Sequence, residues 1–106
     1  MKIAQIEVYP IRAPRKERVI AATGSYTVNA SEFGVIRLLA DDGTEGLGEI
    51  SITYPRIGFS LCHAARTLIA PQLIGMDPLA WPQVLARIDQ ILLGEMSAPY
   101  VRAAFE

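Results

Sequence analysis

Two apolar runs flank a four-residue turn, Asp41–Thr44, near the middle of the chain. An Asp-Gly pair between strand-like segments predicts a β-hairpin, because Gly43 has no Cβ and can take the positive φ that a tight turn requires. We therefore expect antiparallel strands over Phe33–Ala40 and Thr44–Ile50. The incoming run is apolar on both faces apart from Arg37, so we expect its strand to be largely covered on both sides.

The N-terminal segment predicts one more strand, over Lys2–Pro14, where apolar and polar residues alternate. Pro10 indicates an edge strand or a strand end, because proline has no N–H to donate to a neighbour. A connection then follows from Arg15 to about Ala30. It begins with the short basic cluster Arg15–Arg18, which we interpret as a solvated loop. A connection of this length is typical of a functional lid or a disordered segment.

The C-terminal half changes to a helical period. Apolar residues recur at helical spacing from Ser60 until Pro71, and a second helix is expected near Trp81, with Pro82 in its first turn. Ser97 is a candidate N-cap for a third helix. The buried stripe of the second helix is expected to comprise Val84, Leu85, Ile88, Ile91 and Leu92. These elements predict an α+β fold, in which a three-stranded antiparallel β-meander is followed by a small bundle of α-helices.

Composition restricts the function classes. The chain has 106 residues, of which 51% are hydrophobic, and its mean hydropathy is +0.26. No apolar run approaches the roughly 18 residues of a membrane span, and the N-terminus does not resemble a signal peptide. Ten basic against eleven acidic residues argue against a nucleic-acid surface, and the single cysteine fits a reducing cytoplasm. We interpret the surplus apolar surface as a contact for another domain or subunit.

No local pattern supplies catalytic chemistry. Cys62 and His63 are adjacent, so a helix would point them to different sides, and no further Cys or His could complete a zinc site. Glu49 ends a predicted strand beside a loop, which fits a catalytic carboxylate, a structural salt bridge or a cap on nearby backbone. Gly46 and Gly48 lie in a strand pattern, which argues against a phosphate loop and suits a close backbone approach or a bulge.

Two aromatic residues are expected on irregular segments. Tyr26 lies in the long connection, and Tyr54 lies in the loop Ser51–Gly58. Aromatic side chains on loops often contact ligands, but they also pack at the base of a loop. The residues alone leave both interpretations open.

The order of these segments resembles a known domain. The opening MKIAQIEVYPIRAP, the hairpin VIRLLADDGTEGLGE, the helix end LIGMDP and the final SAPYVRAAFE are similar to the N-terminal capping domain of the mandelate racemase and muconate lactonizing enzyme group, within the enolase superfamily. The resemblance covers residues 1–106, and the final segment resembles the start of an Ala-rich helix that continues into a barrel domain absent from this chain.

The resemblance implies that a proton α to a carboxylate is abstracted in the barrel, with a divalent magnesium holding the enediolate. It places no catalytic residue and no metal ligand in this chain. It implies instead that Arg15–Asn29 and Ser51–Gly58 close over the barrel mouth. The implied substrate-contact residues are Val19, Ile20, Ala21, Tyr26, Thr53 and Tyr54.

Several alternatives stay open. The family includes racemases, epimerases, dehydratases and cycloisomerases, and this segment does not separate them. The basic cluster Arg15–Arg18 beside apolar Val19–Ala21 favours a substrate with a carboxylate and an apolar portion. The resemblance implies a barrel domain as partner and a cytoplasmic homo-oligomer without nucleic acid or membrane contacts. A different class remains possible: a free-standing α+β module that binds a protein partner, with no enzymatic activity.

Overall fold

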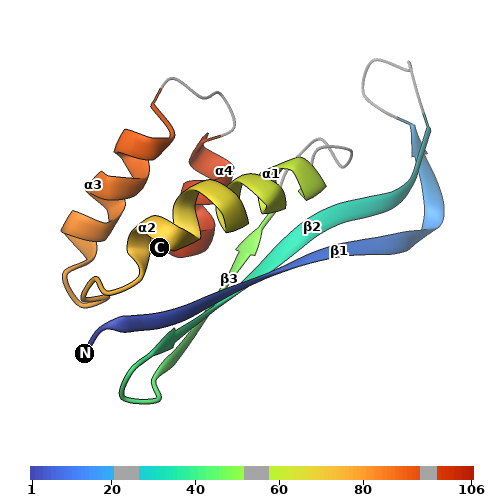
Figure 1. Ribbon diagram of the computed structural model, residues 1–106. Coiled ribbons are helices and arrows are strands. Elements are labelled where there is room, and N and C mark those ends of the chain that lie inside the picture. Colours follow the sequence, from blue (N-terminus) through green and yellow to red (C-terminus); the bar gives the residue numbers. More distant parts are fainter. Residues whose placement is uncertain (21–26, 52–57, 94–97) are drawn as a thin grey trace.

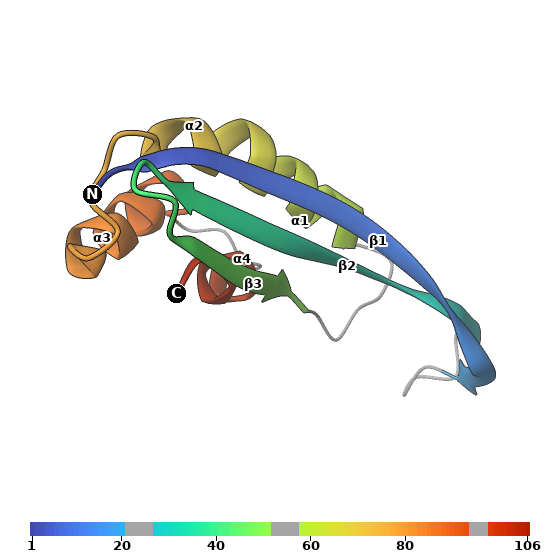
Figure 2. The same ribbon diagram turned by 90° about the horizontal axis from the view of Figure 1, so that it is seen from below.

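The structure, a computed structural model, describes residues 1–20, 27–51, 58–93 and 98–106. A three-stranded antiparallel sheet in the order β1-β2-β3 is followed by helices that gather on one face of it (Figures 1 and 2). The predicted fold class is therefore confirmed. The elements are β1 (Ile3–Ile20), β2 (Thr27–Ala40), β3 (Glu45–Ile50), α1 (Gly58–Ala64), a π-helical segment (Ala65–Ile69), α2 (Ala70–Leu73), α3 (Trp81–Ile91) and α4 (Ala98–Phe105).

The hairpin between β2 and β3 forms as the sequence predicts. Gly43 has a φ of +90°, and the Ala40 N–H donates to the Thr44 carbonyl at 2.8 Å. The Thr44 N–H donates to the Asp42 carboxylate at 2.9 Å, and this hydrogen bond lowers the pKa of Asp42. The turn closes a ladder whose partners run from Leu39 opposite Glu45 back along both strands.

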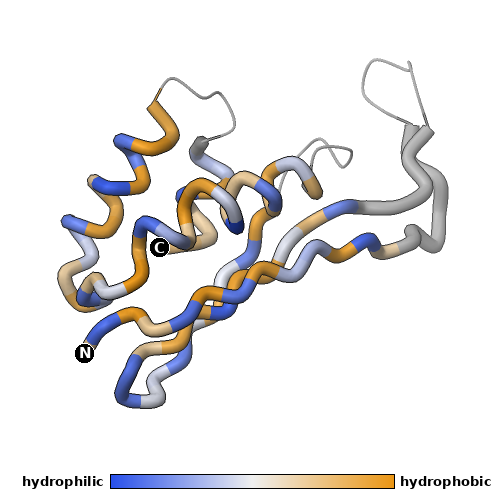
Figure 3. Tube along the Cα trace, viewed as in Figure 1, coloured by the Kyte–Doolittle hydropathy of each residue, from blue (hydrophilic) through white to orange (hydrophobic). Residues whose placement is uncertain are grey.

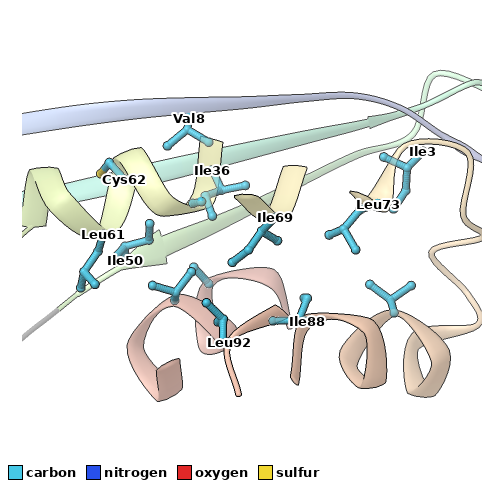
Figure 4. Packing of buried hydrophobic residues seen from close by; sticks show 14 residues of the cluster. Ile3, Val8, Ile36, Ile50, Leu61, Cys62, Ile69, Leu73, Ile88 and Leu92 are labelled. Atoms are coloured by element: carbon cyan, nitrogen blue, oxygen red, sulfur yellow. The ribbon is translucent and has the colours of Figure 1, made fainter. Parts of the chain in front are cut away.

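The core lies between the sheet and the helices. Hydrophilic and hydrophobic residues alternate along much of the described strands (Figure 3), and successive strand residues point to opposite faces of a sheet. Figure 4 shows buried side chains from the sheet and from the helices meeting between the two layers. Full burial of an aliphatic side chain contributes about 1.5–3 kcal/mol. The largest fully buried side chains are those of Ile3, Ile36, Ile50, Ile69, Leu73, Ile88 and Val101.

The prediction of a long connection from Arg15 to about Ala30 is wrong for most of these residues, because they belong to strands. β1 continues to Ile20 and β2 already begins at Thr27. β1 is an edge strand, which tolerates proline because the missing N–H can point away from β2. Between the pairs Pro14–Ala30 and Val19–Val28 the register shifts, and this irregularity hides the strand period from sequence reading.

The expectation that β2 is covered on both faces is also wrong for the described chain. Ile36 and Ala40 face the helices and are buried. Val35, Arg37 and Leu39 point to the other face and are only partly buried. No described helix lies over that second face (Figure 2).

The first helical stretch does not end at Pro71. It begins at Gly58 and continues through α2 to Leu73. The intervening π-helical segment explains the difference, because there the Ala70 N–H donates to the Ala65 carbonyl, five residues back. This wider turn opens the hydrogen-bond ladder just before Pro71, where the ring would otherwise crowd the carbonyl of the preceding turn.

The two remaining helices agree with the sequence. α3 starts at Trp81 with proline in its first turn, and it buries Val84 and Ile88 against the core. Leu92 is also buried, while Leu85 and Ile91 are partly buried beside them. α4 buries Val101 and Ala104, and its Tyr100 and Phe105 are partly buried. The predicted N-cap of this helix, Ser97, lies outside the described residues.

Two glycines allow the helices to approach the sheet closely. A Cβ on Gly48 would overlap the backbone carbonyl oxygen of Ala104 in α4. A Cβ on Gly34 would overlap the Sγ of Cys62 in α1. The bare face of β3 therefore does receive another backbone, as predicted for Gly48.

We predict that Gly48→Ala destabilises the domain by about 1–3 kcal/mol, because the new methyl group forces α4 away from the sheet. Gly46→Ala is the matched control, since a Cβ there meets no atom within 4 Å and the backbone is not left-handed. It should leave stability unchanged or raise it by about 0.4–1 kcal/mol. Guanidinium unfolding of the 106-residue chain measures both, and equal effects would contradict the close contact.

We also predict that Gly34→Ala destabilises the native background but is tolerated in a Cys62→Ala background, because only the sulfur blocks the new methyl group. The next atom, Ile50 Cδ1, is 3.4 Å away and in ordinary contact. A double-mutant cycle by denaturant unfolding should give a coupling free energy of at least about 1 kcal/mol. Additive effects would show that the sulfur and Gly34 do not meet.

Candidate functional site

Two of the six predicted substrate-contact residues lie among the residues that the structure describes. Val19 and Ile20 are in β1, where their backbones pair with Val28 and Thr27, so they lie on a strand rather than in a loop. The other four positions, Ala21, Tyr26, Thr53 and Tyr54, lie outside the described residues. Their role as contacts stays a prediction.

The first predicted segment, Arg15–Asn29, is described only where it belongs to β1 and β2, which form a two-stranded arm. β3 ends at Ile50, opposite Gly34, while β1 and β2 continue pairing as far as Ile20 and Thr27 (Figure 2). Thr27 is seven residue steps along β2 from Gly34, which at about 3.3 Å per residue is roughly 23 Å of ribbon. The arm thus carries the ends of its connection well beyond the sheet of three strands.

The second predicted segment, Ser51–Gly58, is flanked on both sides by residues that contact β2. It leaves from Ile50, which pairs with Gly34, and it returns at Gly58, the first residue of α1. The N–H of Phe59 donates to the Glu32 carboxylate at 3.4 Å, so the start of α1 lies beside β2. Both ends are therefore held near one short stretch of a central strand.

Cys62 fixes α1 to the same stretch. Its Sγ lies 3.8 Å from the carbonyl oxygen of Phe33, as a weak hydrogen-bond donor. Burial raises the pKa of the Cys62 thiol, which keeps it protonated at neutral pH. The neighbouring His63 is exposed. Across the described ranges, no group of three or more His, Cys, Asp or Glu side chains could hold a metal ion.

An ion-pair row crosses the sheet on the face away from the helices. Arg37 Nη1 lies 3.3 Å from Glu7 Oε1, and Arg37 Nη2 lies 3.0 Å from Glu45 Oε2. The hydrogen bond to Arg37 lowers the pKa of Glu45, and the same bond raises the pKa of Arg37. One guanidinium thus links all three strands: Glu7 lies directly opposite Arg37, and Glu45 lies diagonally across from it. The ion pairs found among described residues do not include Glu49, which is exposed.

Sequence reasoning missed two anchoring residues, Glu32 and Arg66. Arg66 lies in the π-helical segment, and its Nη2 donates to the Val8 carbonyl of β1 at 2.5 Å. Both contacts join residues far apart in sequence, and no local period distinguishes these two side chains from other exposed charged residues. These two contacts could be predicted only if the sequence showed which face of the helix packs on which strand.

The described residues form a small domain in which helices cover one face of a three-stranded antiparallel sheet. Its sequence matches the family model described as "Mandelate racemase / muconate lactonizing enzyme, N-terminal domain" over residues 5–104. The fold thus defines an N-terminal domain of the enolase type. The chain belongs to the mandelate racemase/muconate lactonizing enzyme family, as its N-terminal domain.

Individual relatives agree with this assignment. The chain is 28% identical over 109 residues to an N-succinyl-L-Arg/Lys racemase from Bacillus cereus, covering all of this chain and 28% of that protein. Among solved structures it is similar to the L-Ala-D/L-Glu epimerase from Bacillus subtilis, with 30% identity, a TM-score of 0.75, and 98% of this chain against 30% of that chain. It is also similar to a muconate lactonizing enzyme from Pseudomonas fluorescens, with 26% identity and a TM-score of 0.78. This match covers 98% of this chain and 29% of that chain.

The chain therefore spans about three tenths of the length of these relatives. Within the part of the chain that the structure describes, the helices are too short or too polar to cross a membrane.

We predict that the Glu45–Arg37 ion pair stabilises the domain at neutral pH and is lost in acid. The folded-state pKa of Glu45 is lowered, so its contribution is present above the ordinary Glu value of about 4.3 and disappears as pH falls through the lower folded value. Glu45→Gln should be less stable than the parent at pH 7 and equal to it near pH 2. A stability difference that does not change with pH would contradict this pair.

Proposed function

We propose that this chain is the capping and substrate-specificity domain of a longer enzyme that abstracts the proton α to a carboxylate. The proposal rests on how much of each protein the matches include. The racemase match includes all of this chain but 28% of the racemase, and the epimerase match includes 98% of this chain but 30% of the epimerase. In this proposal residues 1–106 form one domain, and a barrel domain supplies the catalytic residues. The chain is not catalytic by itself.

Magnesium, in this proposal, belongs to the barrel domain. The described residues offer no cluster of metal-ligating side chains, so they do not fit a magnesium site. The contribution of this chain is to position the two segments over the substrate and to exclude water from it. The anchoring of the second segment by Glu32 and Cys62 supports such a role, because both of its ends are held against β2.

The proposed substrate is a carboxylic acid with an apolar portion, and the relatives suggest an amino-acid derivative. The names N-succinyl-L-Arg/Lys racemase and L-Ala-D/L-Glu epimerase both describe compounds with a carboxylate next to a carbon that bears an acylated nitrogen. The cluster Arg15–Arg18 supplies cationic side chains close in sequence to apolar Val19 and Ile20. Racemisation or epimerisation at that carbon is the reaction we favour. We further propose a cytoplasmic homo-oligomer.

We predict that Tyr54→Ala in the full-length enzyme lowers kcat/KM about tenfold, a loss of about 1.4 kcal/mol of transition-state stabilisation. Magnesium affinity should not change, because the metal site lies in another domain. Tyr9→Ala is the matched control, since Tyr9 is 46% exposed on β1 and takes no part in the two segments. It should leave kcat/KM unchanged.

Two outcomes would contradict this assignment. An unchanged kcat/KM for Tyr54→Ala, or a loss that only follows lower thermal stability, would remove the contact role of the second segment. A gene that ends at Glu106 without a barrel domain would favour the free-standing interaction module instead.

A further inference from the structure

β1 forms one edge of the sheet, because the strand order is β1-β2-β3 (Figure 2). An edge strand carries a row of backbone N–H and C=O groups that its one neighbouring strand does not use, and a strand of another molecule can pair with them. β1 is 18 residues long, which is ample length for such pairing. What contacts the outward groups of β1 therefore decides whether the sheet can add a strand there.

The direction of these groups follows from the hairpin on the other side of the sheet. The Ala40 N–H donates to the Thr44 carbonyl, so the backbone groups of Ala40 point toward β3 rather than toward β1. Backbone groups alternate in direction along a strand, and the pairing of β2 with β3 has no register shift, so the groups of Ile36 also point toward β3. Its partner on β1, Val8, consequently turns its own N–H and C=O to the outside.

Two prolines fall on the same outward positions of β1. Pro10 and Pro14 each lie an even number of residues after Val8, and no register shift separates them from it, so both turn their nitrogen to the outside. Proline has no N–H, so an incoming strand would lack a donor at both positions. Between Pro14 and Val19 the register shifts, and such an irregularity twists an edge away from a partner strand.

Two further positions are closed by contacts from the helical layer. Near the start of β1, the Ile3 N–H donates to the Met76 carbonyl and the Gly75 N–H donates to the Ile3 carbonyl, each at 2.8 Å. In the middle, Nη2 of Arg66 donates to the outward carbonyl of Val8 at 2.5 Å. Arg66 is exposed, so its guanidinium lies at the open side of β1, where the backbone of an incoming strand would have to lie.

We propose that Arg66 closes the middle of the β1 edge against strand addition by a second copy of this chain. Two identical edges related by a two-fold axis meet as antiparallel strands, so β1 offers its own partner. Between Ile3 and Pro10, the positions Ile6 and Val8 have outward N–H groups. Pairing of two β1 strands over these positions needs the Val8 carbonyl as an acceptor, and Arg66 holds that acceptor. The proposed homo-oligomer therefore uses another surface.

Removal of the Arg66 contact tests this role. In the 106-residue chain, Arg66→Gln removes the donor to Val8 and makes the net charge of −1 more negative, which by itself opposes association. Sedimentation velocity should show association at about tenfold lower concentration than for the parent, the factor that one strand hydrogen bond of typical strength supplies.

Arg87→Gln is the matched control. It makes the same change of charge on α3, where Arg87 is exposed and its Nη1 contacts Gln72 rather than the sheet. This variant should associate no more than the parent. Equal association of Arg66→Gln and Arg87→Gln would overturn the proposal.

Amide exchange and a second substitution locate the contact. In associated Arg66→Gln, the outward amides of Ile6 and Val8 should gain protection from hydrogen–deuterium exchange, as read by NMR. Pro10→Thr adds an outward N–H, so the double variant should associate at still lower concentration, whereas Pro10→Thr alone should resemble the parent. Association without protection of these two amides, or a loss of protection throughout the sheet, would leave Arg66 a purely structural role and overturn the proposal.

Discussion

The distance between the sheet and the helices depends on close contact at two glycine positions of the sheet. Gly34 receives the sulfur of Cys62, and Gly48 receives the carbonyl of Ala104. Any side chain at either position would push a helix outward and open the core that Ile36 and Ile50 fill. Close approach at Gly34 also brings the start of α1 to β2, and this fixes where the segment between β3 and α1 returns to the sheet.

Local chemistry made part of the fold predictable. Gly43 predicts the turn because few other residues take a positive φ. The apolar spacing from Val84 to Leu92 predicts the buried face of α3. The close approach of α4 at Gly48 was also predictable, because a strand position without a side chain leaves room for another backbone. In each case the signal lies within a few residues of the structure that it specifies.

Other features depend on contacts that no local pattern reveals. The arm of β1 and β2 pairs through an irregular register after Pro14, so its strands lack a clean period. The helix passes Pro71 because a π-helical turn precedes it, and sequence reading treats that proline as a stop. In the candidate site, Glu32 meets Phe59 across 27 residues of sequence, a contact that only the folded chain defines. The resemblance to a family supplied the candidate contacts Val19, Ile20, Ala21 and Thr53. Tyr26 and Tyr54 were candidates already from their expected positions on irregular segments.

The role we propose for this domain is to cover an active site that removes a proton next to a carboxylate. The most direct test incubates the full-length protein with magnesium in D₂O and follows the α-proton signals of N-acyl amino acids, dipeptides, α-hydroxy acids and sugar acids by NMR. The account predicts that the α-proton signal of at least one acid disappears, and that a chelator stops the exchange. Retention of every α-proton by folded protein with magnesium present would contradict it.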